Sequence, residues 1–140
     1  MDCCSFQKFL MSGDSLHVCE ANKLIFTSDK AGLLPLLEYI DRFPPVHQRV
    51  TIIDRIMGNG AALLSVLANC KEVYSSLGSQ LAINTLDEYH INYHIMNIVP
   101  YIKKTPDGEM CSMEKLSLHK NPEEFYTSIR NITDGRTSKT

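Results

Sequence analysis

A β-branched run leads straight into a glycine-bearing loop and then into an apolar helix, and this succession constrains the fold most. Val50-Thr51-Ile52-Ile53 is followed by Asp54-Arg55-Ile56-Met57-Gly58-Asn59-Gly60, and residues 61–70 are rich in Ala and Leu. A continuously apolar strand is typical of a sheet covered on both faces, in which helices connect the strands. The segment therefore predicts an α/β protein.

The rest of the chain alternates between strand and helix patterns. Residues 16–19 and 23–27 read as an antiparallel hairpin around a polar turn. The order β-β-α-β-α-β-α-β, followed by short helices, predicts a mixed sheet with helices on both faces and right-handed crossovers. Strands are predicted for residues 50–53, 71–76 and 91–95, and helices for residues 33–40, 61–70 and 81–89, near 111–114 and after Asn121.

Several residues are typical of helix ends. Ser28 or Asp29 is the expected cap of the first of these helices, which holds Pro35 in its first turn and ends at Phe43-Pro44-Pro45. Ser79 is the expected cap of the helix over residues 81–89. Asn121 is expected to cap the last helix, with Pro122 in the first turn and Glu123 and Glu124 complementing the helix dipole.

Length and charge exclude several classes of function. The 140 residues suggest one domain, and the net charge of −2 gives no support for nucleic-acid or anionic-membrane binding. No stretch has the length of a membrane span, and the N-terminus lacks a signal-peptide pattern. Five irregularly spaced cysteines are not a disulfide framework, so a reducing cytoplasm is the expected location.

The loop at residues 54–60 is the first candidate site, because ligands of open α/β sheets bind outside the carboxyl ends of the strands. Backbone N–H groups from Gly58 through Asn59 and Gly60 to Ala61 can bind an anion or a polar ligand edge, and Arg55 adds a planar cation. The loop matches neither the dinucleotide glycine pattern, because Leu63 replaces its third glycine, nor a P-loop. A tight turn that only packs the helix on the sheet is the alternative.

Cys111 marks the second candidate site. If a helix begins there, its positive end lowers the pKa of the thiol and favours the thiolate. Glu114, three residues on, resembles the second half of a capping box. The functional interpretation is a nucleophile or a metal ligand, and the alternative is an ordinary, partly buried cysteine.

These two segments also carry a family resemblance. Asp54-Arg55-x-x-Gly58-Asn59-Gly60-Ala61-Ala62-Leu63-Leu64 and Met110-Cys111-Ser112-Met113-Glu114-Lys115 resemble a prokaryotic family, domain of unknown function 1893. The similarity spans about residues 14–132. It implies a three-layer α/β/α sandwich with a mixed sheet and a cytidine-deaminase-like fold. It also divides the chain into an N-terminal extension (1–13), a single deaminase-like domain (14–132) and a flexible tail (133–140).

The chain departs from both the family and the zinc deaminases. The family usually has Lys, Ala and Pro where this chain has Asn59, Gly60 and Ser112. Zinc deaminases need His or Cys with a nearby Glu at one helix start and Pro-Cys-x-x-Cys at another. The first helix start here has no His, Cys or Glu, and the second offers only Cys111-x-x-Glu114. Ordinary zinc-dependent deamination is therefore not expected.

The leading hypothesis is a deaminase-fold protein without the standard zinc motif that binds a small polar molecule, nucleoside- or nucleotide-like, between the two helix starts. If it is an enzyme, Cys111 is the candidate nucleophile, Asp54 or Glu114 the acid/base, and Arg55 the group that orients the substrate. No cofactor is expected. The alternatives are a non-catalytic homo-oligomeric sensor or scaffold, and an enzyme with a non-standard metal site made by Asp54, Cys111 and Glu114.

Overall fold

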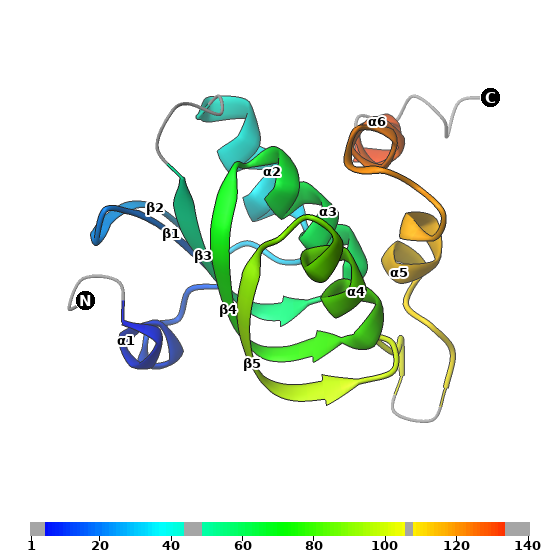
Figure 1. The fold of residues 1–140 in the computed structure, drawn as a ribbon, viewed down its shortest axis with the longest axis horizontal. Helices are drawn as coiled ribbons and strands as arrows, with labels where there is room; N and C mark the ends of the chain where they lie inside the picture. The colour runs from blue at the N-terminus through cyan, green and yellow to red at the C-terminus, as the bar shows by residue number, and fades with distance from the viewer. Residues whose placement is uncertain (1–4, 44–48, 106–107, 134–140) are drawn as a thin grey trace.

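The computed structural model describes residues 5–43, 49–105 and 108–133, which contain a five-stranded sheet (Figure 1). The strands lie in the order β2-β1-β3-β4-β5. β1 is antiparallel to β2 and β3, whereas β3, β4 and β5 run parallel. The predicted mixed sheet and α/β class are confirmed. The strands are β1 (Leu16–Glu20), β2 (Lys23–Ser28), β3 (Val50–Met57), β4 (Cys70–Ser79) and β5 (Asn92–Val99).

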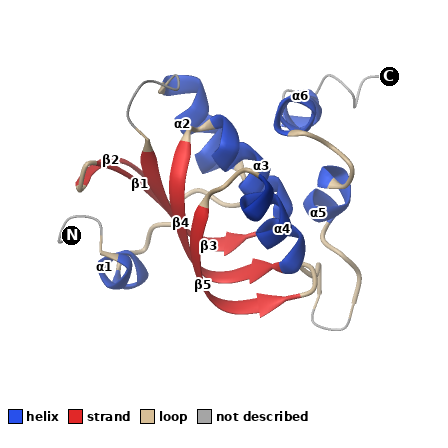
Figure 2. Cartoon of the chain, viewed as in Figure 1, coloured by secondary structure: helices blue, strands red, loops and turns tan. Residues whose placement is uncertain are grey.

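The described helices are distributed unequally over the two faces of the sheet. Figure 2 shows α2, α3 and α4 on one face and α1 on the other. α5 and α6 pack against α3. The helices are α1 (Phe6–Met11), α2 (Leu34–Arg42), α3 (Asn59–Leu67), α4 (Gln80–Glu88), α5 (Ser112–Ser117) and α6 (Pro122–Thr133).

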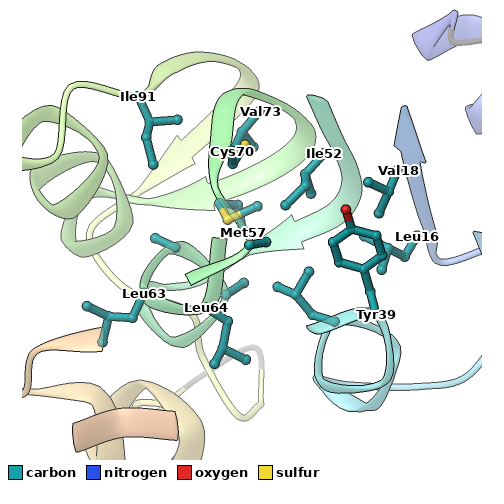
Figure 3. Packing of buried hydrophobic residues seen from close by; sticks show 14 of the residues in the cluster. Leu16, Val18, Tyr39, Ile52, Met57, Leu63, Leu64, Cys70, Val73 and Ile91 are labelled. Atoms are coloured by element: carbon teal, nitrogen blue, oxygen red, sulfur yellow. The ribbon is translucent and has the colours of Figure 1, made fainter. Parts of the chain in front are cut away.

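The main core lies between the sheet and α2–α4. Val18, Ile52 and Val73 are fully buried and are paired in register across β1, β3 and β4. Figure 3 shows this row beside Leu64 of α3 and Tyr39 of α2. Each buried aliphatic side chain of this size contributes roughly 1.5–3 kcal/mol of transfer free energy. The apolar run at Val50–Ile53 is thus the central strand of the core, as the sequence predicts.

α1 makes a second, smaller core on the opposite face. Phe9 is fully buried there against Cys19 and Ile53, and Phe6 packs on Tyr74 with ring centroids 6.0 Å apart. No helix or strand is predicted before Leu16, so the sequence pattern misses α1. Among the described helices, only α1, with six residues, covers this face of the sheet. Helices thus lie on both faces, as predicted, but they cover this face far less than the other.

β3 is longer than predicted. The residue pattern predicts that the strand ends at Ile53 and that residues 54–60 form a loop. In the structure β3 continues to Met57, because Asp54, Ile56 and Met57 pair with Ser75, Leu77 and Gly78 of β4. Asp54, Arg55 and Gly58 make this stretch resemble a loop in sequence. The strand continues because it pairs with β4, about twenty residues further along the chain, which local sequence does not indicate. α3 follows at Asn59 rather than at Ala61.

Most predicted helix ends are confirmed. Pro35 lies in the first turn of α2, which ends at Arg42 with Phe43 as its C-cap. Ser79 caps α4 by accepting the Ala82 N–H, and Asn121 and Glu124 accept each other's backbone N–H groups at the start of α6.

The predicted cap of α2 is wrong. Leu33 occupies the N-cap position without a side-chain hydrogen bond. Ser28 instead accepts the Lys30 N–H at 3.2 Å, because β2 extends through Ser28 and leaves it too far upstream. α6 continues through Thr133, the first residue of the predicted tail. The prolines at 44–45 and residues 134–140 of that tail lie outside the described residues.

None of the helices in the described part of the chain combines the length and apolar composition that crossing a bilayer requires.

Candidate functional site

A cavity of about 360 Å³ opens where β3 ends and where α3 and α5 begin. Ligand pockets typically have volumes of about 300–1,000 Å³, so this one suits a small molecule. Figure 1 shows the arrowheads of β3, β4 and β5 directed toward this side of the molecule. The predicted residues Asp54, Arg55, Gly58, Gly60, Ala61, Cys111 and Glu114 all line it, together with Ser15, Gly32, Leu33, Ile56, Ile102 and Met113.

The two candidate segments therefore lie together, although more than fifty residues separate them in the sequence. Asn59 is the one predicted site residue that does not line the cavity. Its side chain is buried, donates to the Ser117 hydroxyl at 3.1 Å and accepts from the Thr85 hydroxyl. It thus holds α3 to α4 and α5.

Asp54 is the residue of the cavity wall whose ionisation is most strongly perturbed. Desolvation by burial raises the pKa of this carboxyl group to about 7, although hydrogen bonds from the Arg55 and Ile56 backbone N–H groups and the Arg55 charge lower it. The Arg55 N–H lies 2.8 Å from Oδ1. At neutral pH the group is divided between its acid and carboxylate forms, so it can donate or accept a proton.

Glu114 is almost fully buried, at 2% exposure, and lies in the wall of the cavity. Its Oε1 accepts the Asn59 N–H at 2.6 Å and its Oε2 accepts the Ile102 N–H at 2.8 Å. The predicted capping box within α5 is wrong, because the carboxylate reaches to another helix start instead. A carboxylate at that position also stabilises the positive end of α3.

Gly58 makes this approach possible. A Cβ at Gly58 would lie 3.2 Å from Oε1 of Glu114 and 3.3 Å from Cγ1 of Ile102. A side chain there would require the Glu114 carboxylate and the Ile102 side chain to shift. Gly60 is similarly close-packed, since a Cβ would meet the Phe125 ring at 2.6 Å.

The beginning of α3 presents backbone donors to the cavity. The first hydrogen bond within the helix joins the Ala62 N–H to the Gly58 carbonyl. The preceding N–H groups, at Gly60 and Ala61, have no acceptor within the helix by geometry. They lie in the cavity wall, where a polar or anionic ligand edge can accept from them.

Arg55 borders the cavity, but its guanidinium group binds α1. Nε donates to the Asp14 carbonyl at 2.7 Å, and Nη2 donates to the Phe9 and Ser12 carbonyls at 3.3 and 3.4 Å. Its Cζ lies 4.8 Å from the centre of the Phe9 ring. These contacts fasten α1 to β3 directly beside Asp54.

Arg55→Ala is expected to lower the free energy of unfolding by about 1–3 kcal/mol, because three carbonyls lose a charged donor. Hydrogen exchange should accelerate specifically in α1. Arg42→Ala is the matched control, since Arg42 is exposed and packs over the Phe26 ring at 5.5 Å. Urea unfolding measures both changes. Equal destabilisation by the two substitutions would argue against the role of Arg55 in holding α1 to β3.

Cys111 is the N-cap residue of α5, so the predicted helix start at this cysteine is confirmed. The thiol is free and half-buried, and it borders the cavity. Its backbone N–H donates to the Ile102 carbonyl at 2.8 Å. The predicted thiolate character stays a prediction.

Iodoacetamide should alkylate Cys111 in the native protein at least about ten times faster than Cys70. Cys70 is a buried free thiol whose pKa burial raises to about 12, so both access and thiolate formation are suppressed there. Peptide mass spectrometry after timed quenching measures both rates, and unfolding in urea should equalise them. Native rates that are already equal would contradict the placement of Cys111 in the cavity wall.

The residues that sequence reasoning missed are the apolar walls. Leu33, Ile102 and Met113 line the cavity but are not among the predicted site residues, although Met113 lies within the motif around Cys111. Their proximity depends on the return of the chain from β5 to α5. Only their apolar character within otherwise polar connections could have marked them.

A metal centre made by Asp54, Cys111 and Glu114 is not supported. Across the part of the chain that the structure describes, no three His, Cys, Asp or Glu side chains converge as metal ligands. Both oxygens of Glu114 are occupied by backbone N–H groups.

A second hollow, of about 700 Å³ and more open, lies between α4 and β5. It is lined by Glu72, Asp87, His90, Ile91, Asn92, Tyr93 and His94. His94 Nε2 lies 3.2 Å from Glu72 Oε2, so two of its polar groups pair with each other. The cavity beside Asp54 is the better candidate, because its titratable carboxyl group is desolvated.

Comparison with known proteins places these features in a family. The model of a family described as a domain of unknown function (DUF1893) matches residues 5–133. The chain is similar to the crystal structure of a DUF1893 family protein from Thermotoga maritima, with 25% sequence identity and a TM-score of 0.79. That similarity covers 88% of this chain and 83% of the other. No curated protein matches.

Proposed function

We infer a ligand-binding function for this chain, which belongs to the DUF1893 family of domains of unknown function. We propose that the cavity beside Asp54 binds a small polar molecule of nucleoside or nucleotide type. The proposed fold type is cytidine-deaminase-like without the standard zinc motif. Analogy of fold gives the ligand class, and the cavity itself gives the place.

Two features support the proposed fold type. β1 is antiparallel to β3 while the following strands are parallel, and helices lie on both sides of the sheet, as the family resemblance implies. The zinc motif is missing at the corresponding helix starts, where α3 begins with Asn59-Gly60-Ala61 and Cys111 precedes α5.

The observation that carries the proposal is a desolvated carboxyl group in a largely apolar cavity. The pKa of Asp54 is raised to about 7, so the protein maintains an unfavourable environment for this charge. Such perturbed groups concentrate at functional sites. A ligand amide or hydroxyl can hydrogen-bond to Asp54, and its polar edge can meet the N–H groups of Gly60 and Ala61.

A catalytic step would use the same groups. Cys111 is the proposed nucleophile, and Asp54 is the proposed acceptor of its proton, since a carboxyl group with a pKa near 7 exchanges protons readily at neutral pH. The N–H groups of Gly60 and Ala61 would stabilise negative charge that develops on the substrate. Glu114 and Arg55 are proposed to hold the site together rather than to contact the ligand.

The test is calorimetric titration with cytidine, uridine and cytidine monophosphate at millimolar concentrations. At least one probe should bind the wild type, and Asp54→Asn and Cys111→Ser should each weaken binding about tenfold or more. Asp29→Asn, at an exposed position outside the cavity, is the control and should bind as the wild type does. Unchanged affinity in both cavity variants would contradict the proposal.

A further inference from the structure

The two edges of the sheet differ in how they are protected against pairing with another strand. Edge strands expose unpaired backbone N–H and C=O groups, and proteins usually protect them with lysines, bulges or covering segments. β2 has two such features. Lys23 lies in the strand, and the register between β1 and β2 shifts at Val18/Cys19.

β5 has neither. It pairs with β4 without a register shift from Asn92 to Val99, and no Lys, Arg, Asp or Glu occurs between Tyr89 and Ile102. No strand in the described part of the chain pairs with its outer edge.

The exposed side chains of β5 are mainly apolar or amide. Met96 and Ile98 are 63% and 53% exposed. The Asn97 side chain donates to the Ser76 carbonyl on β4, and His94 pairs with Glu72, also on β4. These polar groups are thus satisfied within the sheet, which leaves a regular, uncharged edge with two large apolar side chains.

We propose that β5 is a docking edge for a second copy of this chain, paired antiparallel with its own β5 about a two-fold axis. An uncharged strand of this kind meets itself without like-charge repulsion. Antiparallel self-pairing gives each strand the same partner and closes the assembly at two copies. The two sheets become one continuous sheet of ten strands.

The alternative pairing of β5 with β2 of another copy is head-to-tail. It would leave one edge open at every step and so produce filaments rather than a dimer. The bulge between β1 and β2 and Lys23 oppose this arrangement. The proposal uses no residue of the cavity, so its outcome is independent of ligand binding.

Sedimentation velocity of the full chain from about 1 to 100 μM tests the proposal. The wild type should populate a dimer within this range, and Met96→Lys and Ile98→Lys should each raise the dissociation constant at least tenfold. Leu24→Lys is the matched control on the opposite edge, where Leu24 is 36% exposed, and it should leave the dimer intact. Circular dichroism verifies that the variants are folded.

Hydrogen exchange of the wild type provides a second readout, because protection of residues 92–99 should increase with protein concentration. A wild-type monomer at every concentration would overturn the proposal. So would a dimer that persists in Met96→Lys and Ile98→Lys, or larger assemblies that the Leu24→Lys change abolishes.

Discussion

Glu114→Ala is expected to lower the free energy of unfolding by about 3–5 kcal/mol, the largest effect of any single substitution considered for this protein. The substitution leaves the buried N–H group of Asn59 and the partly buried N–H group of Ile102 without their charged acceptor. It also removes negative charge from the beginning of α3. Urea unfolding followed by circular dichroism measures the change.

Two further variants sharpen this test. Glu114→Gln keeps the shape but replaces one acceptor oxygen with a donor, so about 1–3 kcal/mol of the loss should remain. Glu109→Ala is the control, because Glu109 is 76% exposed and pairs with Lys115 at 3.5 Å; its effect should stay within about 0.5 kcal/mol. Similar losses for Glu109→Ala and Glu114→Ala would refute the assigned role of Glu114.

Asp54→Asn is expected to stabilise the protein at pH 8 by about 2–4 kcal/mol while weakening ligand binding. The folded-state pKa of Asp54, about 7, lies above the ordinary aspartate value of 3.8. The folded state therefore binds this proton more tightly than the unfolded state does. As the pH rises from about 4 to 7, the unfolded carboxyl group ionises first, and stability is progressively lost.

Asparagine removes that penalty and keeps an oxygen for the backbone N–H groups. The difference in unfolding free energy between Asp54→Asn and the wild type should therefore grow from pH 4 to pH 7 and level off above it. Asp29→Asn should run parallel to the wild type over the same range. A pH-independent difference for Asp54→Asn would show that Asp54 ionises normally in the folded protein.

Glu114→Ala is expected to destabilise the protein, whereas Asp54→Asn is expected to stabilise it. This contrast indicates that the protein loses stability at Asp54 in order to keep a carboxyl group in the cavity. Glu114 is buried with both oxygens satisfied, whereas Asp54 is partly buried in the cavity wall and is desolvated at a cost to its ionised form. Residues held in an unfavourable state at a cavity are typical of functional sites. The two carboxyl groups thus have different tasks, although both border the same cavity.

Local patterns predicted the parts of the fold that depend on neighbouring residues. Pro35 in the first turn of α2, Ser79 before α4 and the Asn121–Glu124 pair of α6 act within three or four residues. The apolar run at residues 50–53 likewise indicates a strand with a buried position in the sheet. These elements sufficed to predict the mixed α/β sheet.

Contacts across long stretches of sequence were not predictable in the same way. Glu114 has the spacing of a capping box in α5, yet it binds Asn59, 55 residues earlier in the chain. Arg55 is a planar cation beside the candidate site, which suggests substrate binding. Its guanidinium group instead binds backbone carbonyls up to 46 residues away. In both cases the tertiary partner is a backbone group, which side-chain patterns do not reveal.

Native mass spectrometry of the chain, purified without chelator or affinity metal, tests the central claim most directly. The wild type should have one small organic molecule bound per chain, either copurified or after addition of millimolar cytidine, uridine and cytidine monophosphate. Asp29→Asn should retain this adduct, and Asp54→Asn should lose most of it. A bare wild-type chain under all these conditions, or an adduct equally abundant in Asp54→Asn, would contradict the assignment of the cavity as a small-molecule site.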